Sequence, residues 1–150
     1  MNALIKQQKQ VGSASSIDDL RYAMAAAIES GDQTQILGDT EHFHADGVYG
    51  RKTKIPAGAT IITPVHKKQH ITVALKGICT VADADGNKKD VFAPAVFVTE
   101  PGTQRAVYAH TEVIWFTAHA CEETDLELVE QLLTCDSMAE YQQLQLEADL

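Results

Sequence analysis

The stretch that decides the fold runs from Gly58 to Gly77 and reads GATIITPVHKKQHITVALKG. It places His66 and His70 on either side of the polar break 67–69, between two runs of β-prone residues. If that break is a tight connection, strand alternation lets both imidazoles face the same interior. Two neutral imidazoles that converge in a concave β-structure are the start of a transition-metal site.

Further short β-prone segments surround this stretch, with Pro- and Gly-containing turns between them. The predicted strands are 48–55, 60–65, 71–76, 78–82, 90–93, 95–99, 105–109 and 113–118. Short strands at such regular spacing predict a β-sandwich or barrel, and a two-sheet jelly roll is a natural closure at this size.

Helical patterns flank the β-region. Ser15 or Ser16 can cap a helix that ends at Gly31, Thr124 starts a capping box, and Asp136 can cap a last short helix. We therefore expect four parts, in chain order: a flexible N-terminus (1–14), a helical N-terminal segment (15–39), the β-barrel (40–120) and a helical C-terminal tail (121–150).

The composition is that of an ordinary globular domain. The 150 residues are 45% hydrophobic and 22% charged, and the net charge is −9, which opposes binding to nucleic acid and to anionic membranes. There is no apolar run long enough to span a membrane and no secretory signal pattern. The three cysteines show no CxxC spacing, so reduced thiols and a cytoplasmic location are expected.

The frame from Gly58 to Gly77 resembles the first motif of the cupin family. Pro64 stands in place of the family's first histidine, His66 matches the second, and His70 stands where the family has glutamate. The second motif is matched directly only at Gly102, and Arg105 stands at the place of the third metal histidine. The resemblance implies a mainly β protein, a single jelly-roll cupin barrel with an N-terminal helix and a helical C-terminal tail, which commonly forms a homodimer.

More narrowly, residues 41–130 resemble the small cupin-like proteins of tailed phages and prophages. The residues that carry this resemblance are His42 before Gly47-Val48-Tyr49, Arg51, Pro56-Ala57-Gly58, His66 and His70, the turn from Pro101 to Arg105, Val107-Tyr108-Ala109-His110, and 123–127. It would place the protein in the cytoplasm of a host cell or in the virion, and it implies no particular activity.

A useful metal site needs a third protein ligand beside His66 and His70. The candidates are His42 and His110, with Glu100 as a further one. Two histidines and a carboxylate would suit iron(II), and three histidines would suit zinc, copper, nickel or manganese. The alternative is that the histidines are hydrogen-bonded pocket residues. His44 and His119 are expected to be incidental.

Arg105 is the candidate anion ligand. An arginine stays protonated and does not bind metals, but its planar fork binds a carboxylate or phosphate with two hydrogen bonds. Together with Tyr49, Arg51 and the two histidines it could recognise a small anionic ligand. The alternative is that Arg105 pairs with one of the many acids of this chain.

Two classes of function stay open. In the first, the barrel binds a divalent transition metal, a small anion or both, and the family resemblance implies isomerase or dioxygenase chemistry for a metal-bearing member. In the second, the altered motif means that the pocket is vestigial and the domain is a structural or interaction module of a phage particle or of phage–host interference.

Overall fold

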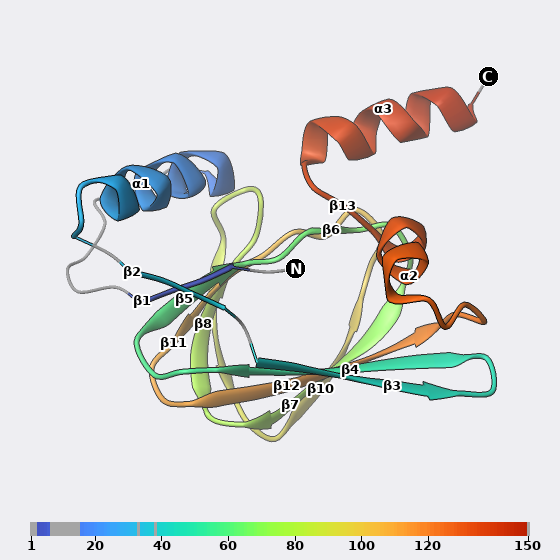
Figure 1. Cartoon of the computed structure of the whole chain (residues 1–150), viewed down its shortest axis with the longest axis horizontal. Helices are drawn as coiled ribbons and strands as arrows, with labels where there is room; N and C mark the ends of the chain where they lie inside the picture. Colours follow the sequence, from blue (N-terminus) through green and yellow to red (C-terminus); the bar gives the residue numbers. More distant parts are fainter. Residues whose placement is uncertain (1–2, 7–15, 33, 38, 150) are drawn as a thin grey trace.

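The computed structural model describes residues 3–6, 16–32, 34–37 and 39–149. Two antiparallel sheets form a barrel-like sandwich (Figure 1). The five-stranded sheet has the order β10 (Ala95–Thr99), β7 (His70–Lys76), β12 (Val113–Ala120), β4 (Val48–Ile55), β3 (Asp39–Ala45). The six-stranded sheet has the order β2 (Thr34–Leu37), β1 (Ala3–Lys6), β5 (Ala59–Ile62), β11 (Ala106–Ala109), β8 (Ile78–Ala82), β9 (Lys88–Phe92).

The hydrophobic core lies between the two sheets. Ile55 and Trp115 of the five-stranded sheet pack with Ile61, Cys79 and Val107 of the six-stranded sheet, and all of them are buried. Side chains alternate between the two faces of a strand, so every second residue of each strand can join this core. The mainly β jelly roll that the sequence predicts is confirmed.

Local turn chemistry sets most strand boundaries. The predicted strands 48–55, 78–82 and 95–99 have the observed bounds, and most of the others shift by one or two residues. The predicted strand 60–65 is wrong, because it is divided into β5 and β6 (Val65–His66) at Pro64. A proline has no N–H to donate to a neighbouring strand, and the N–H of Thr63 donates to the carbonyl oxygen of Arg105 at 2.8 Å.

Three strands precede the first predicted one. β1 lies between β2 and β5 in the six-stranded sheet, where the sequence predicts a flexible N-terminus. The rest of residues 1–14 lies outside the described part of the chain. β2 follows the N-terminal helix, and β3 pairs with β4 along its whole length. These strands add to the barrel that the sequence placed at 40–120.

The predicted helices form, with small changes at their first residues. In α1 (Ile17–Glu29), Ser16 is the N-cap and its Oγ accepts the N–H of Asp19 at 3.1 Å, as expected. In α2 (Leu126–Leu133) the N-cap is Asp125 and not Thr124. Within the described residues, no helix has the length and apolar character that crossing a membrane requires.

The last helix, α3 (Met138–Ala148), is capped by Ser137 and not by Asp136. The Oγ of Ser137 accepts the N–H of Glu140 at 3.1 Å, and the Glu140 carboxylate accepts the N–H of Asp136 at 3.1 Å. This reciprocal pair of bonds satisfies two N–H groups at the start of the helix. Ser137 and Glu140 therefore fix the start of α3, with its N-cap one residue after the predicted cap Asp136.

The C-terminal segment closes one end of the barrel. β13 (Thr134–Cys135) pairs with β6, where Thr134 lies opposite His66. The backbone N–H of Lys67 donates to the carbonyl of Leu133 at 2.8 Å, and its Nζ donates to that of Gln131 at 2.6 Å. Val129 and Leu133 of α2 are buried against Tyr49 of the five-stranded sheet, and Figure 1 shows α2 beside this end of the barrel.

Candidate functional site

Three imidazoles gather at the end of the barrel that α2 covers. The ring of His70 lies between the other two, with its centroid 4.4 Å from that of His66 and 4.3 Å from that of His119. The prediction that His119 is incidental is wrong, because its ring lies against that of His70. The signal that identifies it is its position four residues after Trp115 on one strand, because such residues face the same side of a sheet.

The three imidazoles are neutral near pH 7. Burial, with contributions from His70, His119 and two arginines, lowers the pKa of His66 to about 3. Burial, followed by the charges of His70 and Arg51, lowers the pKa of His119 to about 3, and burial also lowers that of His70. Desolvation disfavours the charged form of a buried base, so these rings can accept or donate hydrogen bonds without carrying charge.

Two imidazole nitrogens among the described residues are buried without a hydrogen-bond partner. They are Nδ1 of His66 and Nε2 of His70. Nδ1 of His70 lies 3.2 Å from the carbonyl oxygen of Lys68, which assigns the proton to Nδ1 and leaves a lone pair on Nε2. Nε2 of His119 is already engaged, since it lies 2.8 Å from the hydroxyl of Thr117.

Two arginines reach the same region. Arg105 donates from Nη1 to the hydroxyl of Thr99 at 3.0 Å, and its guanidinium lies 5.2 Å from the centroid of the Phe97 ring. Arg51 reaches in from β4, and its Nε is buried without a partner. In the part of the chain that the structure describes, the side-chain ion pairs involve lysines and neither of these arginines. Burial lowers the pKa of Arg105, but a guanidinium still keeps its charge near neutral pH.

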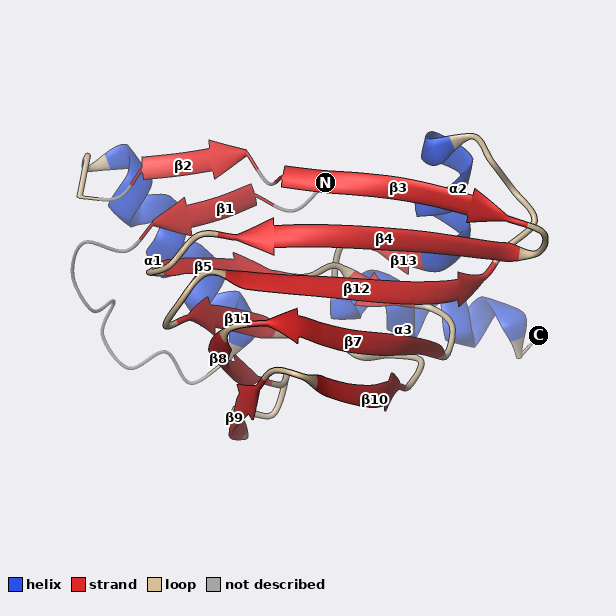
Figure 2. Cartoon of the chain, turned by 90° about the horizontal axis from the view of Figure 1, so that it is seen from below, coloured by secondary structure: helices blue, strands red, loops and turns tan. Residues whose placement is uncertain are grey.

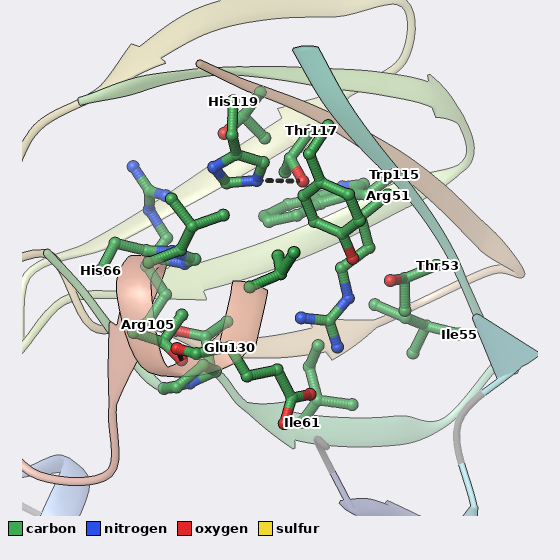
Figure 3. Close-up of a pocket in the computed structure, with 17 residues that line it drawn as sticks. Arg51, Thr53, Ile55, Ile61, His66, Arg105, Trp115, Thr117, His119 and Glu130 are labelled. Atoms are coloured by element: carbon green, nitrogen blue, oxygen red, sulfur yellow. Dashed lines mark hydrogen bonds between the residues drawn. The ribbon is translucent and has the colours of Figure 1, made fainter. Parts of the chain in front are cut away.

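A cavity of about 60 Å³ lies among these groups. Figure 3 shows Arg51, His66, Arg105, His119 and Glu130 around it, and Tyr49 also lines it. His70 packs behind the other two imidazoles and is not among the lining residues. Two guanidiniums against the single carboxylate of Glu130 make the lining positive, and a space of this size holds only a few water-sized groups.

The cavity adjoins a wider groove on the outside of the barrel. The groove has a volume of about 720 Å³ and lies between α1, α2 and the segment around β13. Arg51 and Glu130 line both the cavity and the groove, together with Thr63, Pro64 and Thr134. The route from solvent to the imidazoles therefore passes the C-terminal segment.

The other predicted ligands do not join the histidines at the cavity. Nδ1 of His42 lies 2.6 Å from the hydroxyl of Tyr49, so His42 contacts the lining residue Tyr49 and not the cavity itself. His110 bonds to Thr80 at 2.6 Å, on the six-stranded sheet. Glu100 accepts hydrogen bonds from Gln69 at 3.0 and 3.2 Å in an exposed turn. None of these three side chains lines the cavity.

The residues present do not complete a site for a resident metal. No group of three or more His, Cys, Asp or Glu side chains within the described ranges is arranged to hold a metal ion. The two unpartnered nitrogens of His66 and His70 fit two ligand positions, but no third ligand joins them. The positive charges of Arg51 and Arg105 also oppose a cation in the adjoining cavity.

Comparison with solved structures identifies the fold. A Photorhabdus luminescens protein aligns with a TM-score of 0.51 and 11% identity over 63% of this chain and 84% of that protein. A Salmonella typhimurium LT2 protein whose name links it to ethanolamine utilization aligns with a TM-score of 0.50 and 12% identity over 59% and 72%. A Cupin 2 conserved barrel domain protein of Salinispora arenicola CNS-205 aligns with a TM-score of 0.47 and 15% identity over 54% and 73%.

No family model matches the sequence, and no curated protein matches it either. The two sheets of this chain form a jelly roll, and the first two of these structures align with it at TM-scores of 0.51 and 0.50. Identities this low show the fold alone. Many unrelated activities share such a fold, so its function has to be argued from the cavity.

Proposed function

We propose that the protein binds a small anion in the cavity, with Arg105 and Arg51 as the charged ligands. The observation that carries this proposal is a pair of guanidiniums at a buried cavity, neither in an ion pair with a carboxylate of the described residues. The fold adds a concave interior of the kind that holds small ligands. No catalytic step is assigned to the site.

The energetics favour an anion over an empty cavity. The two guanidiniums line the cavity with one carboxylate, that of Glu130, so one positive charge is left over there. A charged group that leaves water without a countercharge is costly, and a bound anion would supply that countercharge. The planar guanidinium fork suits a carboxylate or another oxyanion. The neutral rings of His66 and His119 and the hydroxyl of Tyr49 can add uncharged hydrogen bonds, and the cavity volume limits the ligand to a few non-hydrogen atoms.

The experiment is a titration of the full chain with formate, acetate, bicarbonate and phosphate. Calorimetry measures the affinity for each anion, and a thermal melt measures the change in melting temperature. We expect at least one of these anions to bind and to raise the melting temperature, and Arg105→Gln to weaken that binding at least tenfold, as loss of a charge-assisted bond predicts. Lys89→Gln is the matched control, since Lys89 is an exposed cation on β9 and does not line the cavity or the groove. Unchanged affinity in Arg105→Gln, or no binding of any of the four anions, would contradict the proposal.

A second candidate ligand is a transition metal held weakly by His66 and His70. The two unpartnered ring nitrogens favour it, and the cupin-type fold is compatible with it. The test is elemental analysis of tag-free protein beside the His66→Ala/His70→Ala double variant. Near-stoichiometric metal in the wild type but not in the double variant would support metal binding. If neither protein holds metal after supply of iron, manganese, nickel and zinc, the anion is the remaining candidate ligand.

The resemblance to small phage proteins, with the host cytoplasm or virion as the location, stays a prediction. Under that prediction a structural or interaction role is the alternative to ligand binding. Labelling of purified phage particles by antibodies to the protein would support this alternative.

A further inference from the structure

The groove beside the cavity has one apolar wall. Met24, Ala25 and Ile28 of α1 line it, together with Ile62 at the end of β5 and Pro64 after that strand. Met24 and Ala25 stand four and three residues before Ile28, so the three side chains share one face of the helix. Figure 2 shows the three helices behind the five-stranded sheet, so the groove that they border lies on the far side of the barrel from the outside of this sheet.

The carboxylates of the groove lie on its other side. They belong to Glu127 of α2, Asp136 after β13 and Glu140 of α3. Arg21 and Lys67 also line the groove, and both donate to backbone carbonyl oxygens of the C-terminal segment. Away from the cavity the lining thus holds three carboxylates against two cations. This small negative charge disfavours a second anionic group on a ligand.

The groove and the cavity meet at two charged residues. Arg51 and Glu130 line both spaces, whereas Arg105 lines the cavity alone, and Figure 3 shows all three side chains around the cavity. The excess positive charge therefore lies at the inner end, and the apolar wall of α1 lies at the outer end. A ligand that matches both ends is anionic at its head and apolar along its chain.

The volumes of the two spaces point to the same kind of ligand. Sites for small organic molecules usually measure about 300 to 1,000 Å³. The cavity of about 60 Å³ is far smaller, and the groove of about 720 Å³ falls within that range. A ligand that fills only the cavity leaves the apolar wall in water, whereas one that extends into the groove covers it.

We propose that the ligand is a monocarboxylate with an apolar chain, its carboxylate held by Arg51 and Arg105 and its chain lying in the groove along α1. This inference rests on the proposed anion site and specifies the ligand of that site. The carboxylate suits the planar guanidinium fork, and unlike phosphate or bicarbonate it carries a hydrocarbon chain. Every methylene that leaves water at the apolar wall adds to the affinity.

The experiment is calorimetry of the full chain with acetate, butyrate, hexanoate and adipate near neutral pH. A fully buried methylene raises affinity about fourfold and a half-buried one about twofold, so hexanoate should bind at least about tenfold more tightly than acetate. Adipate has as many carbons as hexanoate and a second carboxylate, and it should bind more weakly than hexanoate because of the acids in the groove.

Two neighbouring alanines separate the effect on the chain from the effect on the head. Ala25 and Ala26 are both exposed on α1, but only Ala25 lines the groove, and glutamine is a good helix former. We expect Ala25→Gln to weaken hexanoate several-fold and to leave acetate unchanged, and Ala26→Gln, the matched control, to change neither. Arg105→Gln should weaken acetate and hexanoate by the same factor, because it acts on the carboxylate that they share.

The outcomes distinguish this inference from the anion site on which it rests. Acetate binding with hexanoate no tighter, or with a hexanoate affinity that Ala25→Gln leaves unchanged, would overturn the chain in the groove and leave the anion site standing. Tighter binding of adipate, or of hexanoate with a terminal amino group, would assign the groove to a charged chain end and would also overturn it. Failure of every anion to bind would overturn the proposed function as well.

Discussion

The two faces of the five-stranded sheet each depart from the usual arrangement over part of their area, although the apolar core still lies on the inner face. Along β12, Thr117 and His119 face inward toward the cavity, whereas Phe116 and Ala118 face outward. A polar group inside a barrel loses hydration and needs partners, and an apolar group outside gains nothing until something covers it. The contrast teaches that the same strands carry both departures from the usual pattern: polar side chains on the inner side, where we propose a ligand, and apolar side chains on the outer side.

The sharpest test of this comparison uses two adjacent aromatic residues. Trp115 is buried in the core, and Phe116 is partly exposed on the other side of the same strand. We expect Trp115→Ala to lower the free energy of unfolding by about 3 to 5 kcal/mol, as for other large core truncations. Phe116→Ala should lower it by about 1 kcal/mol. Urea unfolding measures both losses, and equal losses for the two variants would refute the assignment of faces.

The second test concerns the polar inner face and pH. The pKa values of His66 and His119, about 3 in the folded chain, lie below the value of about 6.5 for an unfolded chain. The unfolded chain therefore binds more protons between these limits, so stability is complete above about pH 6.5 and is lost as the pH falls toward 3.

The loss should be on the order of a few kcal/mol, seen as a falling melting temperature between about pH 7 and pH 4. The melting temperatures of His66→Gln and His119→Gln should fall less steeply with decreasing pH than that of wild type. Each variant lacks one buried imidazole that resists protonation. His110→Gln is the control on the exposed surface and should follow the wild-type curve. Parallel curves for all four proteins would mean that the buried imidazoles do not cause the loss.

The smallest expected effect concerns Gly50 of β4. In Gly50→Ala the new methyl group would displace the Phe116 ring, at a cost of about 1 kcal/mol or less, because the ring can turn toward solvent. Gly58→Ala is the comparison: its Cβ would meet open space, but its φ is +80°, so backbone strain should lower its stability by about 1 to 3 kcal/mol. Urea unfolding of both variants measures the two losses, and a larger loss in Gly50→Ala would mean that the Phe116 ring cannot move aside.

Much of the fold follows from local pattern. The bounds of β4, β8 and β10 could be predicted because alternating apolar residues stand between turn residues, and both features lie within a few residues of each other. β1 was not predicted, since its place depends on pairing with β5, more than fifty residues away. A strand whose partner lies that far along the chain has little local signal of its own.

The site was predicted in part for the same reason. The spacing of His66 and His70 placed two imidazoles together, and Arg105 was identified as a lining residue from the altered motif. His119 was missed because its orientation depends on which face of β12 the core occupies, and the pairing with β4 and β7 decides that. His42, His110 and Glu100 are close to motif residues in sequence, but strand register turns them toward other partners.

The closure of the barrel by its C-terminal segment has a thermodynamic consequence. Two residue pairs between β6 and β13, the bonds of Lys67 and the packing of Val129 and Leu133 on Tyr49 hold the segment in place. This contact is smaller than the strand pairing within the sheets, so it opens at a lower free energy than they do. Any ligand that binds only when the segment is closed must stabilise the closure, and closure must raise the affinity for that ligand by the same factor. A molecule that binds α2 or α3 only when the segment is open would then lower the affinity for the ligand, although it makes no contact with Arg51 or Arg105.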